Sequence, residues 1–438
     1  MILKFKVKNH LSIKNEVVLD FVTKKKGKHF NFFCEEIGKY QVLKIAMLFG
    51  PNASGKSNIL YSLDRFRSIV LNDKLSKKEP IQQIPFEFDS SSKKYPTFFE
   101  LEFLIDETKY SYSIEFNNEV IISENLYIYA PNKAKYFSRT TNVKTEEINL
   151  VLGNKFDISD IDKRTLTGNT PSNMTIISGY NKTGLQIEVL KKIRDWFKNQ
   201  LNPIIEPRLS LKEYVSKQIY DKKINISLYE TILQEADFNI SKTIINKSEV
   251  TKDMIEVIKD IDPVLYKSMI EEMGKNTNKL VNLSLFFEHT IKKNNKEKRY
   301  KLPDVLESSG TLRYFGLSGV LSEIIDRTGV LFFDELESSL HPDLLNHFIN
   351  TFMLNTKRSQ LIFTSHYYPL LEETNELRKD VVWFTEKLDD GSTELYSLKD
   401  IKIRSALNYY KAYKTGKFGA KPFIGTAYLP KNELDNES

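Results

Sequence analysis

Apolar and polar residues alternate over much of the N-terminal part of the chain, with the period of two that is typical of strands with one buried face. Residues 1–21 alternate on both sides of a turn near Asn9, and residues 98–116 alternate around Asp106. Residues 120–129 continue the pattern. The alternation therefore predicts two hairpins and a further strand in an antiparallel sheet.

Short, unbroken apolar runs predict a second class of strand, which is buried on both faces. Residues 42–49 form one such run, and residues 330–333 and 360–364 form two more. Gly50 ends the first run, and from Ser57 onward the apolar residues follow the spacing of a helix. This order predicts a strand, a glycine-containing loop and a helix.

Helical spacing dominates the middle of the chain, between residues 156 and 284, with the clearest patterns at residues 188–200 and 229–236. No heptad pattern is sustained there, so a long coiled coil is not expected. Further helices are predicted at residues 311–325 and 342–352.

The composition is that of a globular protein, with 40% hydrophobic and 28% charged residues among 438. The mean hydropathy is −0.39, and no apolar run approaches the roughly 20 residues that a spanning helix needs. We therefore expect a cytoplasmic protein with no membrane partner. Cys34 is the single cysteine, so neither an internal disulfide nor a cysteine-based metal site is expected.

The net charge of +6 is a small excess of 64 basic over 58 acidic side chains. Two basic clusters, at residues 24–28 and 292–301, could contact a phosphate backbone. Ordinary solvated loops would have the same composition, so charge alone does not decide between these two interpretations.

Eight consecutive residues match the phosphate-loop pattern G-x-x-x-x-G-K-[ST]: Gly50, Pro51, Asn52, Ala53, Ser54, Gly55, Lys56 and Ser57. Glycines let successive backbone N–H groups point at phosphate oxygens beside a helix N-terminus. Lys56 is expected to reach the β- and γ-phosphates of ATP, and the Ser57 hydroxyl to bind Mg²⁺.

The ends of the two later buried strands carry polar residues suited to the same chemistry. Asp334 and Glu335 follow residues 330–333. We expect Asp334 to hold Mg²⁺ and Glu335 to orient or deprotonate the attacking water. His366 follows residues 360–364 and could contact the γ-phosphate or that water, because imidazole both donates and accepts hydrogen bonds.

These motifs resemble, in their order, those of the ABC-ATPase superfamily. Residues 50–57, 306–311 (LESSGT), 330–335, 337–342 (ESSLHP) and 364–366 (TSH) are similar to its Walker A, signature, Walker B, D-loop and switch-histidine motifs.

In that superfamily two heads close over ATP, and each signature motif contacts the nucleotide held by the other head. The resemblance implies a homodimer or higher oligomer in which Ser308, Ser309 and Gly310 act in trans. The SSGT sequence departs from the LSGGQ of transporters. Gln82 and Gln83 are candidates for the family's glutamine loop.

The resemblance implies an α/β fold, namely an ABC-type P-loop NTPase head. Such a head has a mixed central sheet, flanking helices and an antiparallel subdomain, here interrupted by a helical insertion. The expected domains are an N-terminal lobe at residues 1–155, the insertion at 156–284 and a C-terminal lobe at 285–438.

A narrower resemblance concerns residues 3–14, 85–89 and 405–425, which are similar to AAA_21-like ATPase subunits of RloA, AbiLi and OLD-like anti-phage defence systems. It implies an ATPase that controls a separate effector, a nuclease or toxin, in abortive infection, with DNA or a phage component as a further candidate partner. Two alternatives stay open: an ATP-gated scaffold with little turnover, and a DNA-repair or genome-maintenance ATPase of the SMC kind.

Overall fold

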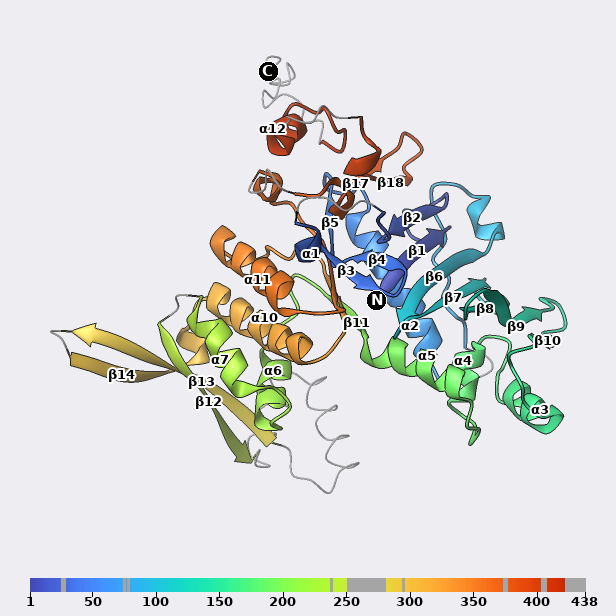
Figure 1. Cartoon of the computed structure of the whole chain (residues 1–438), viewed down its shortest axis with the longest axis horizontal. Coiled ribbons are helices and arrows are strands. Elements are labelled where there is room, and N and C mark those ends of the chain that lie inside the picture. The colour runs from blue at the N-terminus through green and yellow to red at the C-terminus, as the bar shows by residue number, and fades with distance from the viewer. Residues whose placement is uncertain are drawn as a thin grey trace, which may run out of the picture. The chain divides into compact units, whose positions relative to one another are not determined.

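The computed structural model describes residues 1–24, 29–73, 76, 79–236, 239–249, 281–293, 296–372, 377–402 and 408–421. Most of the first basic cluster and both ends of the 405–425 motif lie outside these residues. The chain divides into two compact units (Figure 1). The first comprises residues 1–205, 330–335 and 360–438, and the second residues 206–329 and 336–359.

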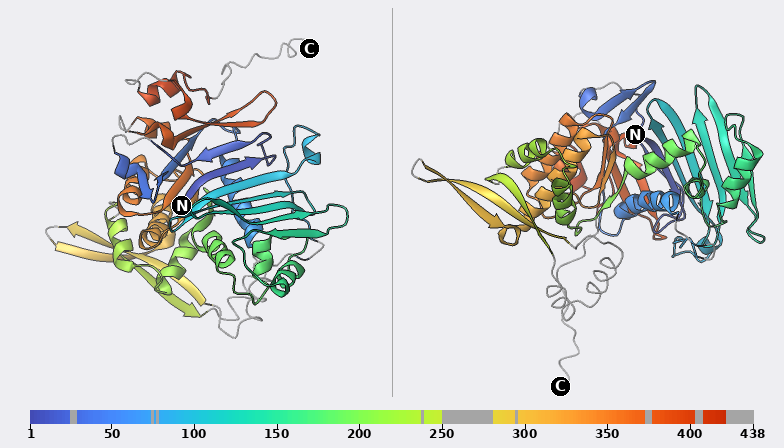
Figure 2. Two further views of the ribbon diagram at one scale, coloured as in Figure 1. Left: turned by 45° about the vertical axis from the view of Figure 1, so that its right-hand side comes forward. Right: turned by 90° about the horizontal axis from the view of Figure 1, so that it is seen from below.

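A seven-stranded antiparallel sheet forms one layer of the first unit, and Figure 2 shows its strands side by side. In spatial order the strands are β10 (Ile148–Leu152), β9 (Lys133–Thr141), β8 (Ile121–Tyr129), β7 (Thr108–Phe116), β6 (Thr97–Ile105), β1 (Ile2–Lys8) and β2 (Val17–Asp20). Alternate residues of β6 are buried, as the period of two requires. Both predicted hairpins are confirmed, with Asn9 and Asp106 in left-handed conformations at their turns.

Helices cover one face of this sheet through aromatic contacts. Phe66 of α2 (Lys56–Leu71) stacks on Tyr112 of β7 at 5.6 Å between ring centroids. Trp196 of α5 (Glu188–Asn199) stacks on Phe103 of β6 at 4.4 Å. Two shorter helices, α3 (Asp160–Gly168) and α4 (Ile176–Tyr180), complete this part. None of the helices in the described ranges is long and apolar enough to cross a membrane.

The second sheet of the first unit has a parallel core whose strands are buried along their length. Its spatial order is β11 (Leu201–Ile205), β15 (Val330–Phe333), β16 (Gln360–Thr364), β5 (Ile45–Phe49), β17 (Val382–Lys387) and β18 (Thr393–Ser397). Only β18 runs antiparallel to its neighbour. The α/β fold class, with a mixed central sheet and an antiparallel subdomain, is confirmed.

Small elements fill the remainder of the first unit. They are α1 (Phe30–Phe33), β3 (Cys34–Ile37), β4 (Tyr40–Leu43), α12 (Tyr409–Lys414) and the 3-10 turns η1 (Ser92–Lys94), η3 (Tyr368–Leu371), η4 (Lys379–Val381) and η5 (Leu398–Asp400). The single strand expected at residues 42–49 is in fact two strands. β4 pairs with β3, and β5 begins after Lys44, so the chain changes sheets at this one charged residue of the run.

In the second unit, helix α10 (Ser309–Asp326) lies among α6 (Lys212–Tyr220), α7 (Ile226–Gln234) and α11 (Pro342–Asn355) (Figure 1). A Cβ on Gly316 or Gly319 would approach side chains of the α6 region to 2.5 Å, so glycine is needed for this packing. A three-stranded antiparallel sheet, β12 (Ile240–Glu249), β13 (Val281–Lys293) and β14 (Lys296–Pro303), and the turn η2 (Asp304–Leu306) complete the unit.

The expectation that residues 156–284 are helical is correct only in part. Helices α3 to α7 lie there, but so do β11 and β12. β11 is a strand because its backbone pairs with β15 in the parallel sheet, and β12 because it pairs with β13. The tertiary partners override the weak local pattern in both places.

A buried ion pair joins the antiparallel sheet to the segment before α4. Arg139 of β9 and Glu124 of β8 are fully buried, 3.3 Å apart. Glu124 also accepts hydrogen bonds from the Tyr112 hydroxyl at 2.7 Å and the Ile176 N–H at 2.9 Å. Burial raises the pKa of the Glu124 carboxyl, and Arg139 opposes this shift.

We predict that Arg139→Leu destabilises the protein by about 3–5 kcal/mol, because it leaves Glu124 buried without its cation. The free energy of unfolding in urea measures this loss. Arg164→Leu, at an exposed arginine of α3, is the matched control and should change stability by less than about 0.5 kcal/mol. Equal unfolding midpoints for both variants would contradict the prediction.

Candidate active site

Residues 50–55 form a tight loop between β5 and α2, and at two of its positions only glycine fits. Gly55 has φ +95°, and a Cβ there would collide with the hydroxyls of Thr393 and Ser12. A Cβ on Gly50 would meet Thr385. The sequence forces the loop to turn here, which brings its backbone amides and the start of α2 together.

Hydroxyl groups from distant segments hold this loop. Ser54 Oγ shares a hydrogen bond of 2.6 Å with Thr385 Oγ1, and Thr393 Oγ1 donates to the Ser54 carbonyl at 2.9 Å. Ser12 Oγ lies 2.7 Å from Thr393 Oγ1 and accepts from the Asn58 amide at 2.7 Å. The β1–β2 turn and the β17–β18 hairpin thus fix the loop from behind.

Lys56 is the first residue of α2, and it is 5% exposed. Its ammonium donates to the carbonyls of Gly50 at 2.8 Å and Pro51 at 3.1 Å. The cation therefore lies against the loop itself, where a bound phosphate could replace these neutral acceptors.

The Asp334 carboxylate connects the loop to the two neighbouring strands. It follows β15 and is 6% exposed. Its Oδ1 accepts hydrogen bonds from Ser57 Oγ and from Thr364 Oγ1, each at 2.7 Å. The hydroxyl and carboxylate oxygens of Ser57 and Asp334 are the ligand types that Mg²⁺ prefers beside a nucleotide, so these residues fit the expected metal. Within the described ranges, no group of three or more His, Cys, Asp or Glu side chains could hold a metal on its own.

Glu335 and His366 lie next to each other at the same edge of the sheet. Glu335 Oε1 is 3.5 Å from His366 Nε2, and the two side chains are 43% and 33% exposed. Glu335 adopts φ +47°, an unfavourable conformation for a residue with a side chain. Its N–H donates to Thr364 Oγ1 at 2.8 Å, which helps to hold this conformation. The carboxylate is thus accessible to a water molecule while its backbone is fixed.

The signature candidate lies in the second unit, at the start of α10. Ser308 is the N-cap, with its hydroxyl accepting from the Thr311 N–H at 3.0 Å. Ser308 and Ser309 are exposed. A Cβ on Gly310 would come within 3.1 Å of the Ser339 carbonyl, so the D-loop candidate packs against the signature candidate inside this unit.

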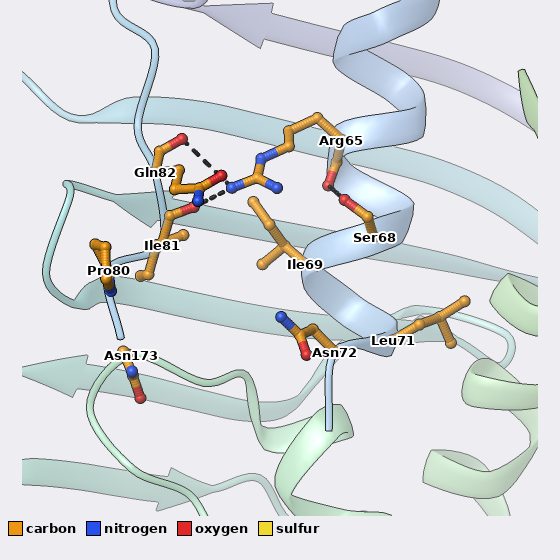
Figure 3. Close-up of a pocket in the computed structure, with 9 residues that line it drawn as sticks. All are labelled: Arg65, Ser68, Ile69, Leu71, Asn72, Pro80, Ile81, Gln82 and Asn173. Carbon is orange, nitrogen blue, oxygen red and sulfur yellow. Dashed lines mark hydrogen bonds between the residues drawn. The ribbon is translucent and has the colours of Figure 1, made fainter. Parts of the chain in front are cut away.

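The glutamine-loop candidates contact other parts of the first unit. Figure 3 shows Gln82 beside the Arg65 guanidinium, which donates to its carbonyl at 3.3 Å, at a cavity of about 370 Å³. The Gln83 amide donates to the Tyr95 carbonyl at 2.9 Å. Arg65 is eight residues beyond Ser57, or about 12 Å along the helix axis. Among the described contacts, neither glutamine touches Ser57 or Asp334, so their assignment stays a prediction.

Several residues that shape the site were missed by the sequence reasoning. Thr364 belongs to the TSH triplet, so its position at a strand end was a usable signal. Tyr368 donates from its hydroxyl to the Gly50 carbonyl at 3.2 Å and stacks on Tyr413 of the C-terminal motif at 4.2 Å. Thr385 and Thr393 carried no signal, because they reach the loop only through the pairing of β17 with β5 and β18.

Comparison with known proteins gives one family and a set of distant structures. Residues 45–372 match the family model AAA_21, "AAA domain, putative AbiEii toxin, Type IV TA system". The structure is similar to the "SMC head domain from Thermotoga maritima", with 13% identity, a TM-score of 0.39, and coverage of 92% of this chain and 99% of that one. It is also similar to an Smc head domain from Pyrococcus furiosus bound to the C-terminal domain of ScpA, with 14% identity, a TM-score of 0.30, and coverage of 95% and 98%. The comparison with curated proteins gave no match.

We predict that Gly55→Ala destabilises the loop, because a left-handed residue with a Cβ costs about 1–2 kcal/mol before its collision with Thr393 and Ser12 is counted. Thermal unfolding should show a lowered Tm. Gly168→Ala is the matched control, since a Cβ at Gly168 meets no atom within 4 Å. An unchanged Tm for Gly55→Ala would mean that the loop is not held as described.

Proposed function

The chain belongs to the AAA_21 family of AAA domains, and from this premise we propose that it binds ATP with Mg²⁺ and hydrolyses the γ-phosphate. One observation supports this most directly: the hydrogen bond between Ser57 and Asp334, 2.7 Å long, at the end of an intact phosphate loop. A hydroxyl at the start of the loop helix and a carboxylate at the end of a nearby parallel strand are the pair that phosphate-loop enzymes use beside a nucleotide.

Each residue of the loop then has a role in binding. The backbone N–H groups of the loop, except at Pro51, which has none, and the Lys56 ammonium bind the phosphate oxygens. Ser57 and Asp334 would hold Mg²⁺, which, when bound, neutralises charge on the phosphates. Thr364 keeps Asp334 in place by donating to the same oxygen that accepts from Ser57.

Glu335 is the residue that we assign to the attacking water. Its carboxylate accepts a proton from the water or orients it, and the neighbouring His366, 3.5 Å away, contacts the γ-phosphate or that water. The partial exposure of both side chains leaves space for the water molecule.

We predict that Glu335→Gln keeps ATP binding and slows turnover by about 10²- to 10⁴-fold, because the amide retains the shape but cannot act as a base. Calorimetry and steady-state phosphate release measure the two properties separately. Lys56→Ala is the contrasting variant, and it should lose ATP affinity because the phosphate charge is no longer compensated. Near-normal turnover of Glu335→Gln would remove Glu335 from this role. Unchanged ATP affinity in folded Lys56→Ala would refute the phosphate-loop assignment.

We further propose that the site is completed by a second copy of the chain, whose Ser309 and Gly310 contact the nucleotide. The surface around the signature candidate supports this proposal. Ser308 and Ser309 are exposed, and the two preceding apolar residues, Val305 and Leu306, are 80% and 68% exposed. Large apolar side chains at this level of exposure are typical of a surface that becomes covered in an assembly.

Mixing two inactive variants tests this arrangement. Lys56→Ala disables binding and Ser309→Arg disables the signature, so a mixed dimer retains one site with both elements intact. We expect part of the ATPase activity to return on mixing, while each variant alone stays inactive. Mixed dimers that form but recover no activity would contradict action in trans by independent sites.

The biological role that we propose is control of a separate effector, a nuclease or toxin, in anti-phage defence. The sequence resemblance to defence ATPases supports this proposal, and the family description names a toxin system. Phosphate release with and without the candidate effector separates a hydrolysis-driven cycle from an ATP-gated scaffold, which would need little turnover.

A further inference from the structure

A two-stranded ribbon in the second unit carries an unusual concentration of positive charge. The pairing of β12 with β13 ends at Ile240 and His289, and the Thr290 N–H still donates to the Asn239 carbonyl. Among the described residues, β13 and β14 continue beyond this point as a pair. Figure 1 shows them extending away from the helices of their unit. Residues 292–301 contain six basic residues and one acidic residue, whereas the whole chain has a net charge of +6.

The basic residues on one face of the ribbon have no acidic counterparts. Directly opposite residues share a face, and here Lys293 faces Lys296, Ile291 faces Lys298 and Tyr300 faces His289. No carboxylate of the described chain lies within ion-pair distance of these three lysines. We call the five residues Ile291, Lys293, Lys296, Lys298 and Tyr300 the lysine face.

The opposite face differs, because two of its three basic residues pair with carboxylates, and the third, Lys301, lies over the Phe286 ring. Lys292 pairs with Glu297 at 3.4 Å, and Arg299 pairs with Glu288 at 3.7 Å. The contrast shows that the ribbon can accommodate carboxylates beside its basic residues. Their absence from the lysine face therefore leaves an uncompensated field on one side.

The pair formed by Lys293 and Lys296 is unfavourable in the isolated ribbon. Directly opposite Cβ atoms lie about 4.5–5.5 Å apart, and like charges at this separation destabilise a strand pair. A polyanion bound across the lysine face would relieve this repulsion.

The base of the ribbon is firmly attached to its unit. Phe287 is fully buried and makes an edge contact with Phe315 of α10 at 5.4 Å between ring centroids. His289 Nε2 lies 2.7 Å from Oε1 of Glu307, a residue of the signature candidate 306–311. The lysine face continues the same side of β13, so it is presented from a fixed base.

We propose that this ribbon binds duplex DNA through its phosphate backbone, independently of base sequence. A two-stranded ribbon fits the major groove, which is about 12 Å wide. Lys293 and Lys296 at the tip of the ribbon, and Lys298 one same-face pair nearer the base, can then contact phosphates. Ile291, opposite Lys298, and Tyr300, at the base end of the face, are 43% and 49% exposed and can contact sugars and base edges. This activity goes beyond ATP hydrolysis and does not depend on it.

Titration of the full-length protein with a fluorescent duplex of about 30 base pairs, over about 50–200 mM salt, tests the proposal by anisotropy. The triple variant Lys293→Gln, Lys296→Gln and Lys298→Gln removes three phosphate contacts. The logarithmic salt slope should therefore fall by about 2.7, and binding should weaken by about tenfold or more. The matched control exchanges Lys135, Lys144 and Lys182 for Gln, which are exposed lysines of the first unit. It should bind as the parent does.

Lysines on strand edges also prevent sheets from associating edge to edge. If this were the only role of the lysine face, replacing its lysines would leave the DNA affinity and the salt slope unchanged. Equal affinities and salt slopes for the triple variant and the parent would overturn the proposal. Tighter binding of a single strand than of the duplex, or equal binding of polyglutamate, would overturn it as well. If the triple variant fails to fold, Lys296→Gln alone should reduce the slope by about 0.9.

Discussion

The Asp334 carboxylate accepts hydrogen bonds from Ser57 and Thr364, and this interaction joins the ends of three neighbouring parallel strands. Strands β5, β15 and β16 come from distant parts of the sequence, yet their carboxyl ends meet at one edge of the sheet. The phosphate loop, the acidic pair and the TSH triplet are thereby brought within hydrogen-bonding distance of one another. The rest of the site depends on this convergence, because a shift of one strand would separate the oxygens of Ser57 and Asp334.

The phosphate loop also relies on side-chain contacts with residues that are distant in the sequence. Its glycines permit the turn, but hydroxyls of Thr385, Thr393 and Ser12 occupy the space that a side chain on Gly50 or Gly55 would need. These hydroxyls belong to hairpins at opposite ends of the chain. Hairpins at the two ends of the chain therefore shape the back of the phosphate loop, although Thr385 and Thr393 belong to no recognised motif.

The sequence predicted those features whose cause is local. The alternation of apolar and polar residues predicted the hairpins around Asn9 and Asp106, and the unbroken apolar runs predicted β15 and β16. It failed where pairing with a distant strand decides the outcome. β11 has no alternating pattern and contains Pro203, so only its partner β15 makes it a strand. The chemical roles of Glu335, His366 and Ser309, and the lobe boundaries, stay predictions, because they concern ligands and assemblies rather than the folding of this chain.

The position of the Lys56 ammonium has a consequence for selectivity among anions. In the structure it already has two internal acceptors, the carbonyls of Gly50 and Pro51. An incoming anion must compete with these groups for the ammonium. Its net gain in binding free energy is therefore the difference between a hydrogen bond to a charged acceptor and a hydrogen bond to a neutral one. A small monovalent anion gains little from this exchange. If the loop binds ATP as we propose, the triphosphate would gain more, because it would also engage the loop amides, and the internal acceptors would then favour ligands of high charge.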